Sequence, residues 1–380
     1  MLAYLRLRNL TPKVSFIILI LALSLCVSNS AFGVSYQIES LGTLGGTFAR
    51  AYGVSGAWIS GQSKIADGSV RGFLWSDGDM HELATLGGTA SHSQSVNAQG
   101  IAAGYALNAL GNMRPAVWDG SGVIELPTLG GTKGSVWDIS DDLDALNNSY
   151  LNSNTYAVGN SFINSNTYHA TLWSGQTAYD LGTLGGAYSN AYGTSSSGWI
   201  VGEANDSYGS NWATAWVNKV PQKIGGFQGG SWSTARAVNS NNQVIFYGNT
   251  SSSNARSALW SNGGFTEMGT LGGSMTYAYG LNDMGLAVGE SELSSGFVHA
   301  FVYNNGLMQD LGTLGGYFSK AYAIDNNGVI VGMAYDQQGQ THAVRWVPVP
   351  EPNGAIALTA ILGALACNMK NRRRRGNPLA

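Results

Sequence analysis

The sequence has few charged residues and no helical pattern in its central part, and each deficit excludes a class of protein. Asp, Glu, Lys and Arg make up only 11% of the 380 residues. Between the two ends, no apolar stretch repeats with the period of a helix, so helical bundles and coiled coils are excluded. The 53 glycines, together with abundant Ser and Asn, favour short strands joined by many turns. We therefore predict an all-β fold.

Cysteine is almost absent. It occurs only at Cys26 and Cys367, close to the two ends of the chain. If both ends are removed by processing, the mature protein has no disulfide and no thiol chemistry. Its stability must then come from a hydrophobic core, and roughly 300 residues can bury enough surface for one.

The N-terminal segment has the three parts of an export signal. Arg6, Arg8 and Lys13 precede the apolar run VSFIILILALSLCV, and small residues follow up to Gly33. A positive start, an apolar centre and a small-residue cleavage site are typical of a secretory signal peptide. We predict a cleaved signal peptide over residues 1–33, with a retained membrane anchor as the alternative.

The C-terminal segment, residues 348–380, also looks like a processing signal. Its apolar run at 354–369 is shorter than the ~20 residues that an ordinary membrane helix needs. The arginine block that follows favours the cytoplasmic side of a membrane. The segment therefore predicts membrane contact through a short C-terminal helix, either transient or as a plain anchor.

The order of these parts closely resembles the PEP-CTERM sorting tail of exported proteins in Gram-negative bacteria. That resemblance implies that an exosortase, a membrane-embedded transpeptidase-like enzyme, recognises and removes the tail. The residues that carry the resemblance are Val349, Pro350, Glu351 and Pro352, followed after the apolar run by Arg372, Arg373, Arg374 and Arg375.

Removal of both ends changes the charge of the protein. The leader holds three of the 19 basic residues and the tail holds five, which leaves 11. Of the 22 acidic residues only Glu351 is lost, so the body of residues 34–350 carries a net charge of 11 minus 21, about −10. Such a surface repels nucleic acid and anionic lipid, so we predict neither as a partner of the body.

The central part of the chain is built from a repeat. The segment TLGG or a near copy recurs with its Thr at 43, 85, 128, 183, 270 and 313, and a seventh copy, IGGFQGG, has Phe227 in that place. The spacings are 42, 43, 55, 44, 43 and 43 residues, so only the third unit carries an insertion. A regular period in the low forties is typical of a repeat architecture.

Each repeat contains four short strand patterns, as in the blade of a β-propeller. The first such strand in the chain has no partners before it, and the last repeat, ending in THAVRWV, lacks its fourth strand. Pairing of these two terminal strands would close a ring and remove both open sheet edges. We predict a seven-bladed β-propeller over residues 34–347, closed in this way. An open β-solenoid is the alternative.

In most repeats a basic residue is followed eleven positions later by an acidic residue. We predict structural cross-strand pairs, with the two residues facing each other directly in an antiparallel pair. In one unit the acid is replaced by Lys223 and the base by Trp212, which avoids repulsion between like charges. The predicted pairs are Arg71 and Glu82, Arg114 and Glu125, His169 and Asp180, Arg256 and Glu267, and His299 and Asp310.

The repeat letters resemble the HAF extracellular repeat, through strands such as His299-Ala300-Phe301 and the neighbouring LGTLGG. The resemblance covers roughly residues 36–346. It implies a location outside the cytoplasm and no established chemistry.

Candidate sites for chemistry are few. No stretch fits a phosphate-binding loop, because GGTKGS at 130–135 has its lysine before the glycine and no helix after it. The third unit carries Asp138, Asp141, Asp142 and Asp144, and hard oxygen ligands of this kind can hold Ca²⁺. The spacing lacks the Gly and the distal Glu of an EF-hand, so a solvated acidic loop is the preferred interpretation and no other cofactor is predicted.

The sequence thus predicts an exported binding or structural protein of the cell surface or extracellular matrix, with no catalytic residues assigned. The resemblance to exosortase-sorted proteins makes extracellular polysaccharide the first ligand to test. The alternatives are a polysaccharide-active enzyme, either a glycoside hydrolase or a lyase, and a purely structural surface layer. An acidic pair outside the repeat pattern that converges in the central channel would favour the enzyme.

Overall fold

The computed structural model describes residues 34–140 and 156–350. The predicted signal peptide, the tail from Glu351 onward, and Asp141, Asp142 and Asp144 lie outside the described residues. Residues Tyr36–Val349 form one compact unit. Within the described ranges, no helix has the length and apolar character needed to cross a membrane.

All regular structure in the described residues is β-strand. The strands are β1 (Val34–Ser40), β2 (Gly45–Ser55), β3 (Trp58–Ile65), β4 (Val70–Ser76), β5 (Asp79–Leu83), β6 (Gly87–Val96), β7 (Ala102–Asn108), β8 (Met113–Trp118), β9 (Val123–Glu125), β10 (Gly134–Ile139), β11 (Tyr156–Phe162), β12 (Tyr168–Ser174), β13 (Thr177–Asp180), β14 (Gly185–Thr194), β15 (Ile200–Asp206), β16 (Asn211–Val217), β17 (Val220–Gly225), β18 (Ser233–Val238), β19 (Val244–Asn249), β20 (Ala255–Ser261), β21 (Gly264–Glu267), β22 (Gly272–Leu281), β23 (Ala287–Leu293), β24 (Val298–Asn304), β25 (Leu307–Asp310), β26 (Gly315–Ile324), β27 (Ile330–Asp336) and β28 (Thr341–Pro350).

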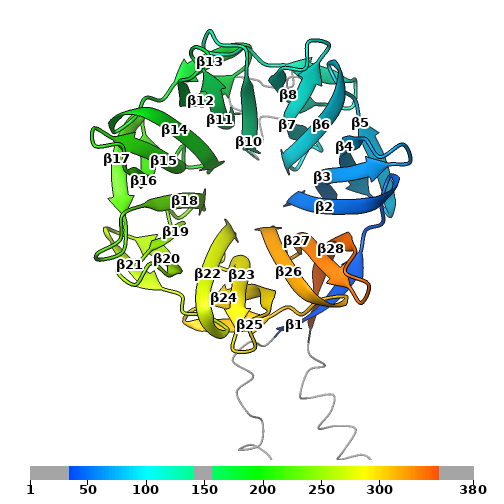
Figure 1. Cartoon of the computed structure of the whole chain (residues 1–380), viewed down its shortest axis with the longest axis vertical. Coiled ribbons are helices and arrows are strands. Elements are labelled where there is room, and N and C mark those ends of the chain that lie inside the picture. The colour runs from blue at the N-terminus through cyan, green and yellow to red at the C-terminus, as the bar shows by residue number, and fades with distance from the viewer. Residues whose placement is uncertain (1–33, 141–155, 351–380) are drawn as a thin grey trace, which may run out of the picture. The chain divides into compact units, whose positions relative to one another are not determined.

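These strands form four-stranded antiparallel units, here called blades, that surround a central axis (Figure 1). Five blades are separate sheets: β2–β5, β6–β9, β10–β13, β14–β17 and β18–β21. In the remaining sheet, β22–β25 are joined to β26–β28 and β1 by a single parallel pair, Val298 and Phe318. The first strand of each blade lies nearest the axis (Figure 1). The predicted four-strand repeat and the propeller class are confirmed.

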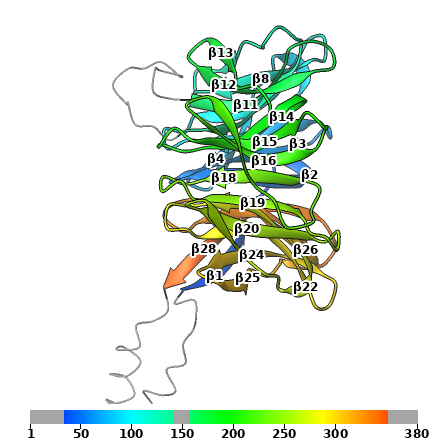
Figure 2. The same cartoon turned by 90° about the vertical axis from the view of Figure 1, so that its left-hand side faces the viewer.

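The two terminal strands of the unit pair with each other, so the open solenoid is excluded. β1 lies beside β28 in both views (Figures 1 and 2) and is its hydrogen-bonded neighbour. Just after β1, the Leu41 N–H donates to the Ala343 carbonyl at 2.9 Å. The side chains of Arg345 and Glu39 form an ion pair at 2.7 Å across the same junction.

The TLGG segment is the joint between blades, and Thr313 to Gly316 show how it works. The Thr313 hydroxyl accepts from the Gly315 N–H at 3.1 Å and donates to the Gly316 carbonyl at 2.8 Å. Gly315 has φ of +96°, a conformation that side chains disfavour. A Cβ on Gly316 would lie 2.5 Å from the Asp336 carbonyl oxygen. Both glycines are therefore needed for the turn.

The third strand of each blade carries an aromatic residue that packs in the core. The seven residues are Trp75, Trp118, Trp173, Trp216, Trp260, Tyr303 and Trp346. Six of the seven are buried, and Trp260 is half-buried. Three indoles also donate to a carbonyl of the joint that enters their blade, for example Trp346 Nε1 to Leu311 O at 2.9 Å. A ring of exposed indoles for sugar stacking is therefore absent at these positions.

Buried hydroxyls fasten neighbouring blades together. Ser319 on β26 donates to the Gly312 carbonyl at 2.6 Å and accepts from the Ala300 N–H of the preceding blade at 2.8 Å. These bonds satisfy backbone groups at the blade junction that the blade's own ladder leaves unpaired. Ser189 makes the same two bonds, and Thr276 donates to the corresponding carbonyl of Gly269. Ser91 and Ser233 also accept from an N–H of the preceding blade but donate one residue earlier, to the carbonyls of Leu83 and Gly225.

Replacement of a junction hydroxyl should destabilise the body. In Ser319→Ala, the buried Ala300 N–H loses its acceptor, so we expect unfolding to become easier by about 1–3 kcal/mol. Thermal or denaturant unfolding of the full chain measures this change. Ser295→Ala in an exposed turn is the matched control and should stay within about 0.5 kcal/mol of the parent. Equal stability of the two variants would contradict the role of the hydroxyl.

Candidate binding site in the central channel

Every innermost strand carries a β-bulge at the same repeat position, and the bulged residue faces the channel. The ladder skips one residue between Ala51 and Gly53, and the other innermost strands skip the equivalent residue. A bulge leaves one residue unpaired and re-aims its side chain. The seven bulged residues, here called the channel ring, are Tyr52, Gln94, Trp137, Tyr192, Arg236, Tyr279 and Tyr322.

Glycine on the second strand makes room for the bulge. A Cβ on Gly332 would lie 1.9 Å from the Lys320 carbonyl oxygen of β26. The equivalent glycines of five other blades are equally close to their innermost strands. In the blade of β18–β21 the position is Phe246, which packs against Phe227 and Phe265. Nothing in the structure explains why this blade alone tolerates a side chain there.

The channel ring lines a cavity of about 230 Å³. Each innermost strand contributes its bulged residue and the two residues that follow it. A second hollow of about 370 Å³ shares Val54, Thr194, Val238, Leu281 and Ile324 with the first and is bordered by the turns after the innermost strands. The cavity is therefore continuous with the face of the propeller that carries these turns.

Glu203 and Glu290 lie behind the channel ring, and both carboxylates accept hydrogen bonds from protein groups. Glu203 accepts from Tyr192 Oη at 3.0 Å, Asn190 Nδ2 at 3.1 Å and Thr234 Oγ1 at 2.7 Å. The other blades have Gln, Tyr, Asn or Met at the equivalent position, except for a second glutamate, described next.

Glu290 accepts from Tyr279 Oη at 2.8 Å and from Lys320 Nζ at 2.9 Å. Burial raises the pKa of the Tyr192 and Tyr279 phenols, and the neighbouring glutamates raise it further. Both phenols therefore remain protonated at neutral pH and act as donors to the carboxylates.

Arg236 is the cation of the channel ring. Its guanidinium lies over the Tyr192 ring, 4.3 Å from the centroid, and 5.6 Å from the Tyr279 centroid. Its Nε is buried and has no hydrogen-bond partner in the described part of the chain. Because the two ring faces hold the guanidinium by cation–π attraction, it stays in the channel without a carboxylate.

A second polar cluster lies on the two inner strands of each of the first two blades, β2 and β3 in one and β6 and β7 in the other. Gln62 Nε2 donates to Tyr52 Oη at 2.9 Å, and the His92 ring stacks on Tyr105 at 4.8 Å between centroids. Burial lowers the pKa of His92 to about 4, and the nearby Arg50 contributes to the lowering. His92 is therefore neutral at pH 7.

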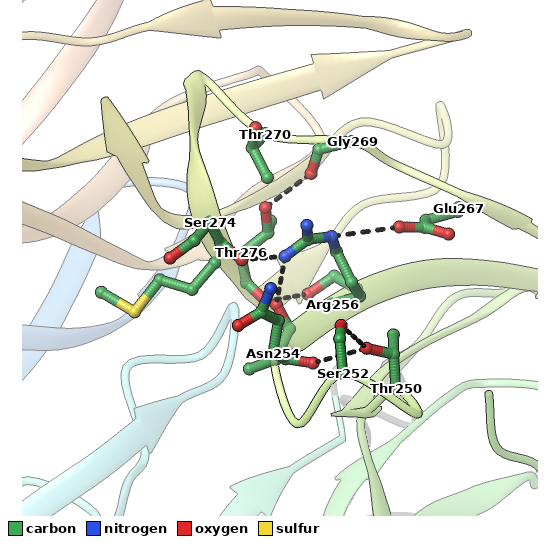
Figure 3. Close-up of polar contacts among 12 residues, drawn as sticks. Thr250, Ser252, Asn254, Arg256, Glu267, Gly269, Thr270, Ser274 and Thr276 are labelled. Atoms are coloured by element: carbon green, nitrogen blue, oxygen red, sulfur yellow. Dashed lines mark hydrogen bonds and ion pairs between the residues drawn. The ribbon is translucent and has the colours of Figure 1, made fainter. Parts of the chain in front are cut away.

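The predicted cross-strand pairs are in contact but are diagonal. Arg256 Nε lies 3.3 Å from Glu267 Oε1, although the ladder places Glu267 opposite Ala258 (Figure 3). The same offset of two residues holds in the other pairs, so the prediction that they face each other directly is wrong. The remaining distances are 2.8 Å for Arg71 and Glu82, 2.6 Å for Arg114 and Glu125, 2.9 Å for His169 and Asp180, and 2.9 Å for His299 and Asp310.

These pairs also connect neighbouring blades. Arg256 donates to the Ser274 carbonyl at the start of the next blade, where Thr276 in turn donates to Gly269 (Figure 3). Arg71 donates in the same way to the Thr89 carbonyl at 2.6 Å. At the unit that lacks the pair, Lys223 Nζ lies 3.1 Å from the centroid of the Trp212 ring. The contacts give these residues structural roles on the outer part of the blades.

Asp138, the one described member of the proposed acidic cluster, contacts protein groups. Its carboxylate accepts from Ser95 Oγ at 2.8 Å and from the Thr194 N–H at 2.9 Å, and so links three innermost strands. Among the described residues, no group of three or more His, Cys, Asp or Glu is placed to hold a metal ion.

The channel ring is not among the sites predicted from the sequence, although the sequence carries a signal for it. Each ring residue lies nine positions after the marker residue of its repeat, from Tyr52 after Thr43 to Tyr322 after Thr313. Four of the seven are Tyr, mostly in the short motif Ala-Tyr-Gly. The repeated Tyr marks a position that has the same geometry in every blade. At Gln94, Trp137 and Arg236 a different residue type stands at that position.

Comparisons with known proteins bear on the fold alone. No protein-family model matches the sequence, and no protein of curated function matches it significantly. A puromycin hydrolase mutant in complex with PGG aligns with a TM-score of 0.51 at 11% identity, over 78% of this chain and 51% of the hydrolase. This chain therefore spans about half the length of that enzyme.

Two further solved structures align less closely. TolB from Acinetobacter baumannii has a TM-score of 0.41 at 13% identity, over 83% of this chain and 79% of TolB. A fucose-recognising lectin from Aleuria aurantia, a six-bladed β-propeller, has a TM-score of 0.34 at 10% identity, over 84% of this chain and 98% of the lectin. The strand topology by itself defines the class of this protein as the β-propeller.

The low pKa of His92 gives a testable dependence of stability on pH. The folded state releases the His92 proton at about pH 4, whereas an ordinary histidine has a pKa of 6.5. Between these values the unfolded chain binds more protons, so stability should rise with pH from about 4 to 6.5 and this contribution should be complete above 6.5. The change is at most about 3 kcal/mol.

NMR titration of the His92 ring in the full chain measures its pKa directly. Unfolding of His92→Asn at pH 4.5 and 6.5 should show a smaller pH dependence than the parent protein. A His92 midpoint near 6.5 would contradict the assigned environment.

Proposed function

We propose that this chain is an exported protein of the cell surface or extracellular matrix, sorted by an exosortase, whose seven-bladed propeller binds extracellular polysaccharide. The sorting rests on the sequence of residues 1–33 and 348–380. The blade count rests on reading the eight-stranded sheet as two blades that meet at one parallel pair. The binding function rests on the channel ring.

The channel ring has the composition of a sugar site. Tyr and Trp offer apolar ring faces with a polar edge, and the amide of Gln94 and the guanidinium of Arg236 offer hydrogen bonds of fixed direction. Polar ligands bind in cavities that combine such apolar faces with a few placed donors. A cavity of about 230 Å³ admits a unit the size of one sugar residue. The ring is the single observation that carries the binding proposal.

Processing is tested on the protein isolated from its native host. Peptide mapping of both termini by mass spectrometry should find a chain that starts near Gly33 and ends near Pro350. A chain that retains Arg372–Arg375 and the leader would contradict export and sorting. Expression without the tail should release the body from the membrane fraction.

Binding is tested with the full-length protein on an array of polysaccharide fragments. We expect retention of at least one class of oligosaccharide, and Trp137→Ala should weaken it about tenfold or more, because the channel loses its largest aromatic face. Tyr179→Ala, on the outermost strand of a blade, is the matched control and should bind as the parent does. Absence of any binding, or equal loss in both variants, would contradict the proposal.

The enzyme alternative is favoured by one observation. Glu203 and Glu290 are two carboxylates at a position that is not acidic in the other blades, and both lie behind the channel ring. Protein donors occupy both carboxylates, which is typical of a structural role rather than of a free acid and base. Cleavage of an array oligosaccharide that Glu203→Gln abolishes would replace binding by hydrolysis or elimination as the function.

A further inference from the structure

Protein groups satisfy the three carboxylates of the channel, whereas two donors of the channel ring have no acceptor in the described part of the chain. The carboxylates of Glu203, Glu290 and Asp138 each accept at least two hydrogen bonds from protein groups. In contrast, the Nε of Arg236 is buried without a hydrogen-bond partner, and Arg236 takes part in none of the ion pairs found among the described residues. The imbalance between donors and acceptors indicates what a complementary ligand must supply.

A second unpartnered donor lies in the same ring. The indole Nε1 of Trp137 is buried and lacks an acceptor among the described residues. The Trp137 ring contacts Tyr192 edge-on at 5.5 Å, and Tyr192 in turn carries Arg236 on its face. The three residues come from β10, β14 and β18, so consecutive blades place both donors on one side of the cavity.

We propose that this side of the channel is an anion subsite centred on Arg236, which selects an acidic glycan carrying a carboxylate or a sulfate ester. An oxyanion accepts the bidentate bonds that a guanidinium offers and that no protein group takes. A neutral sugar supplies only hydroxyls and leaves the half-buried guanidinium without a counter-charge. The inference rests on the proposed binding of polysaccharide and specifies its class.

The net charge of the body does not oppose this assignment. The body carries about −10, from 11 basic and 21 acidic residues. At physiological ionic strength the Debye length is about 8 Å, so charges on the outer blades are largely screened from the channel. The local groups therefore decide the selectivity. Glu203 and Asp138 are hydrogen-bonded by neutral protein donors, whereas no protein group in the described ranges accepts from the buried Nε of Arg236.

The test compares two ligands that differ only in oxidation at C6: cellotriose, and cellotriouronic acid, in which each of the three sugar units carries a carboxylate. Calorimetric titration of the full-length protein should give a dissociation constant at least about tenfold lower for the acidic trisaccharide. Arg236→Gln should abolish the preference. Arg236→Lys keeps the charge without the planar fork and should give an intermediate preference.

Arg114→Gln is the matched control, since Arg114 is paired with Glu125 away from the channel. It should retain the full preference, and unfolding curves establish that each variant is folded. Equal affinity of the parent for both trisaccharides, or an equal loss in Arg114→Gln, would overturn the anion subsite. Binding of neither trisaccharide, nor of inorganic sulfate, would overturn it too.

The outcomes separate this inference from the proposed function. Retention of neutral oligosaccharides on the array, unchanged in Arg236→Gln, would refute the subsite and support polysaccharide binding. Binding of inorganic sulfate that Arg236→Gln removes, with no oligosaccharide retained, would support the subsite and refute polysaccharide binding.

Discussion

One extra residue in each innermost strand determines how the propeller presents side chains to its channel. In a regular strand the residues of the channel ring would be paired in the ladder, and successive side chains would point to opposite faces of the sheet. The bulge takes one residue out of the ladder and turns it toward the axis. It also brings the strand close to its neighbour, so that six of the blades have glycine opposite, as at Gly332, whereas the blade of β18–β21 has Phe246. In these six blades the glycine of the second strand is a consequence of the bulge in the first.

The polar groups of the interior are of two kinds: those that bond neighbouring blades together, and those that have no protein partner among the described residues and are available to a ligand. Junction hydroxyls such as Ser319 and outer pairs such as Arg256 with Glu267 bond to the neighbouring blade as well as to their own (Figure 3). Their partners are backbone carbonyls and N–H groups that any repeat provides, and this is why the residues recur. Arg236 has no such partner and does not recur, which is consistent with a role outside the framework.

Much of the framework could be predicted from the sequence, because it depends on features that repeat. The four-strand unit follows from the turn residues, and the pairing of β1 with β28 follows from the offset between the first and last repeats. The direct opposition of His299 and Asp310 was wrong, because the tight turn after Asn304 pairs Phe301 with Asp310 and leaves the histidine two residues away. The bulge could not be predicted, because it occurs in every innermost strand and so leaves the spacing of the repeats unchanged.

In a propeller of near-identical blades, a departure from the repeat is informative only where the geometry is the same in every blade. The insertion of the third repeat departs most in sequence, but Asp138 beside it bonds to other innermost strands and serves the framework. Gln94, Trp137 and Arg236 depart at the ring position, where every blade presents a side chain to the same cavity. The backbone there is held constant by the bulge, so a change of residue alters the chemistry of the channel and little else. Selection for a ligand can act on these positions without disturbing the fold, and this separates the candidate site from the repeated structure around it.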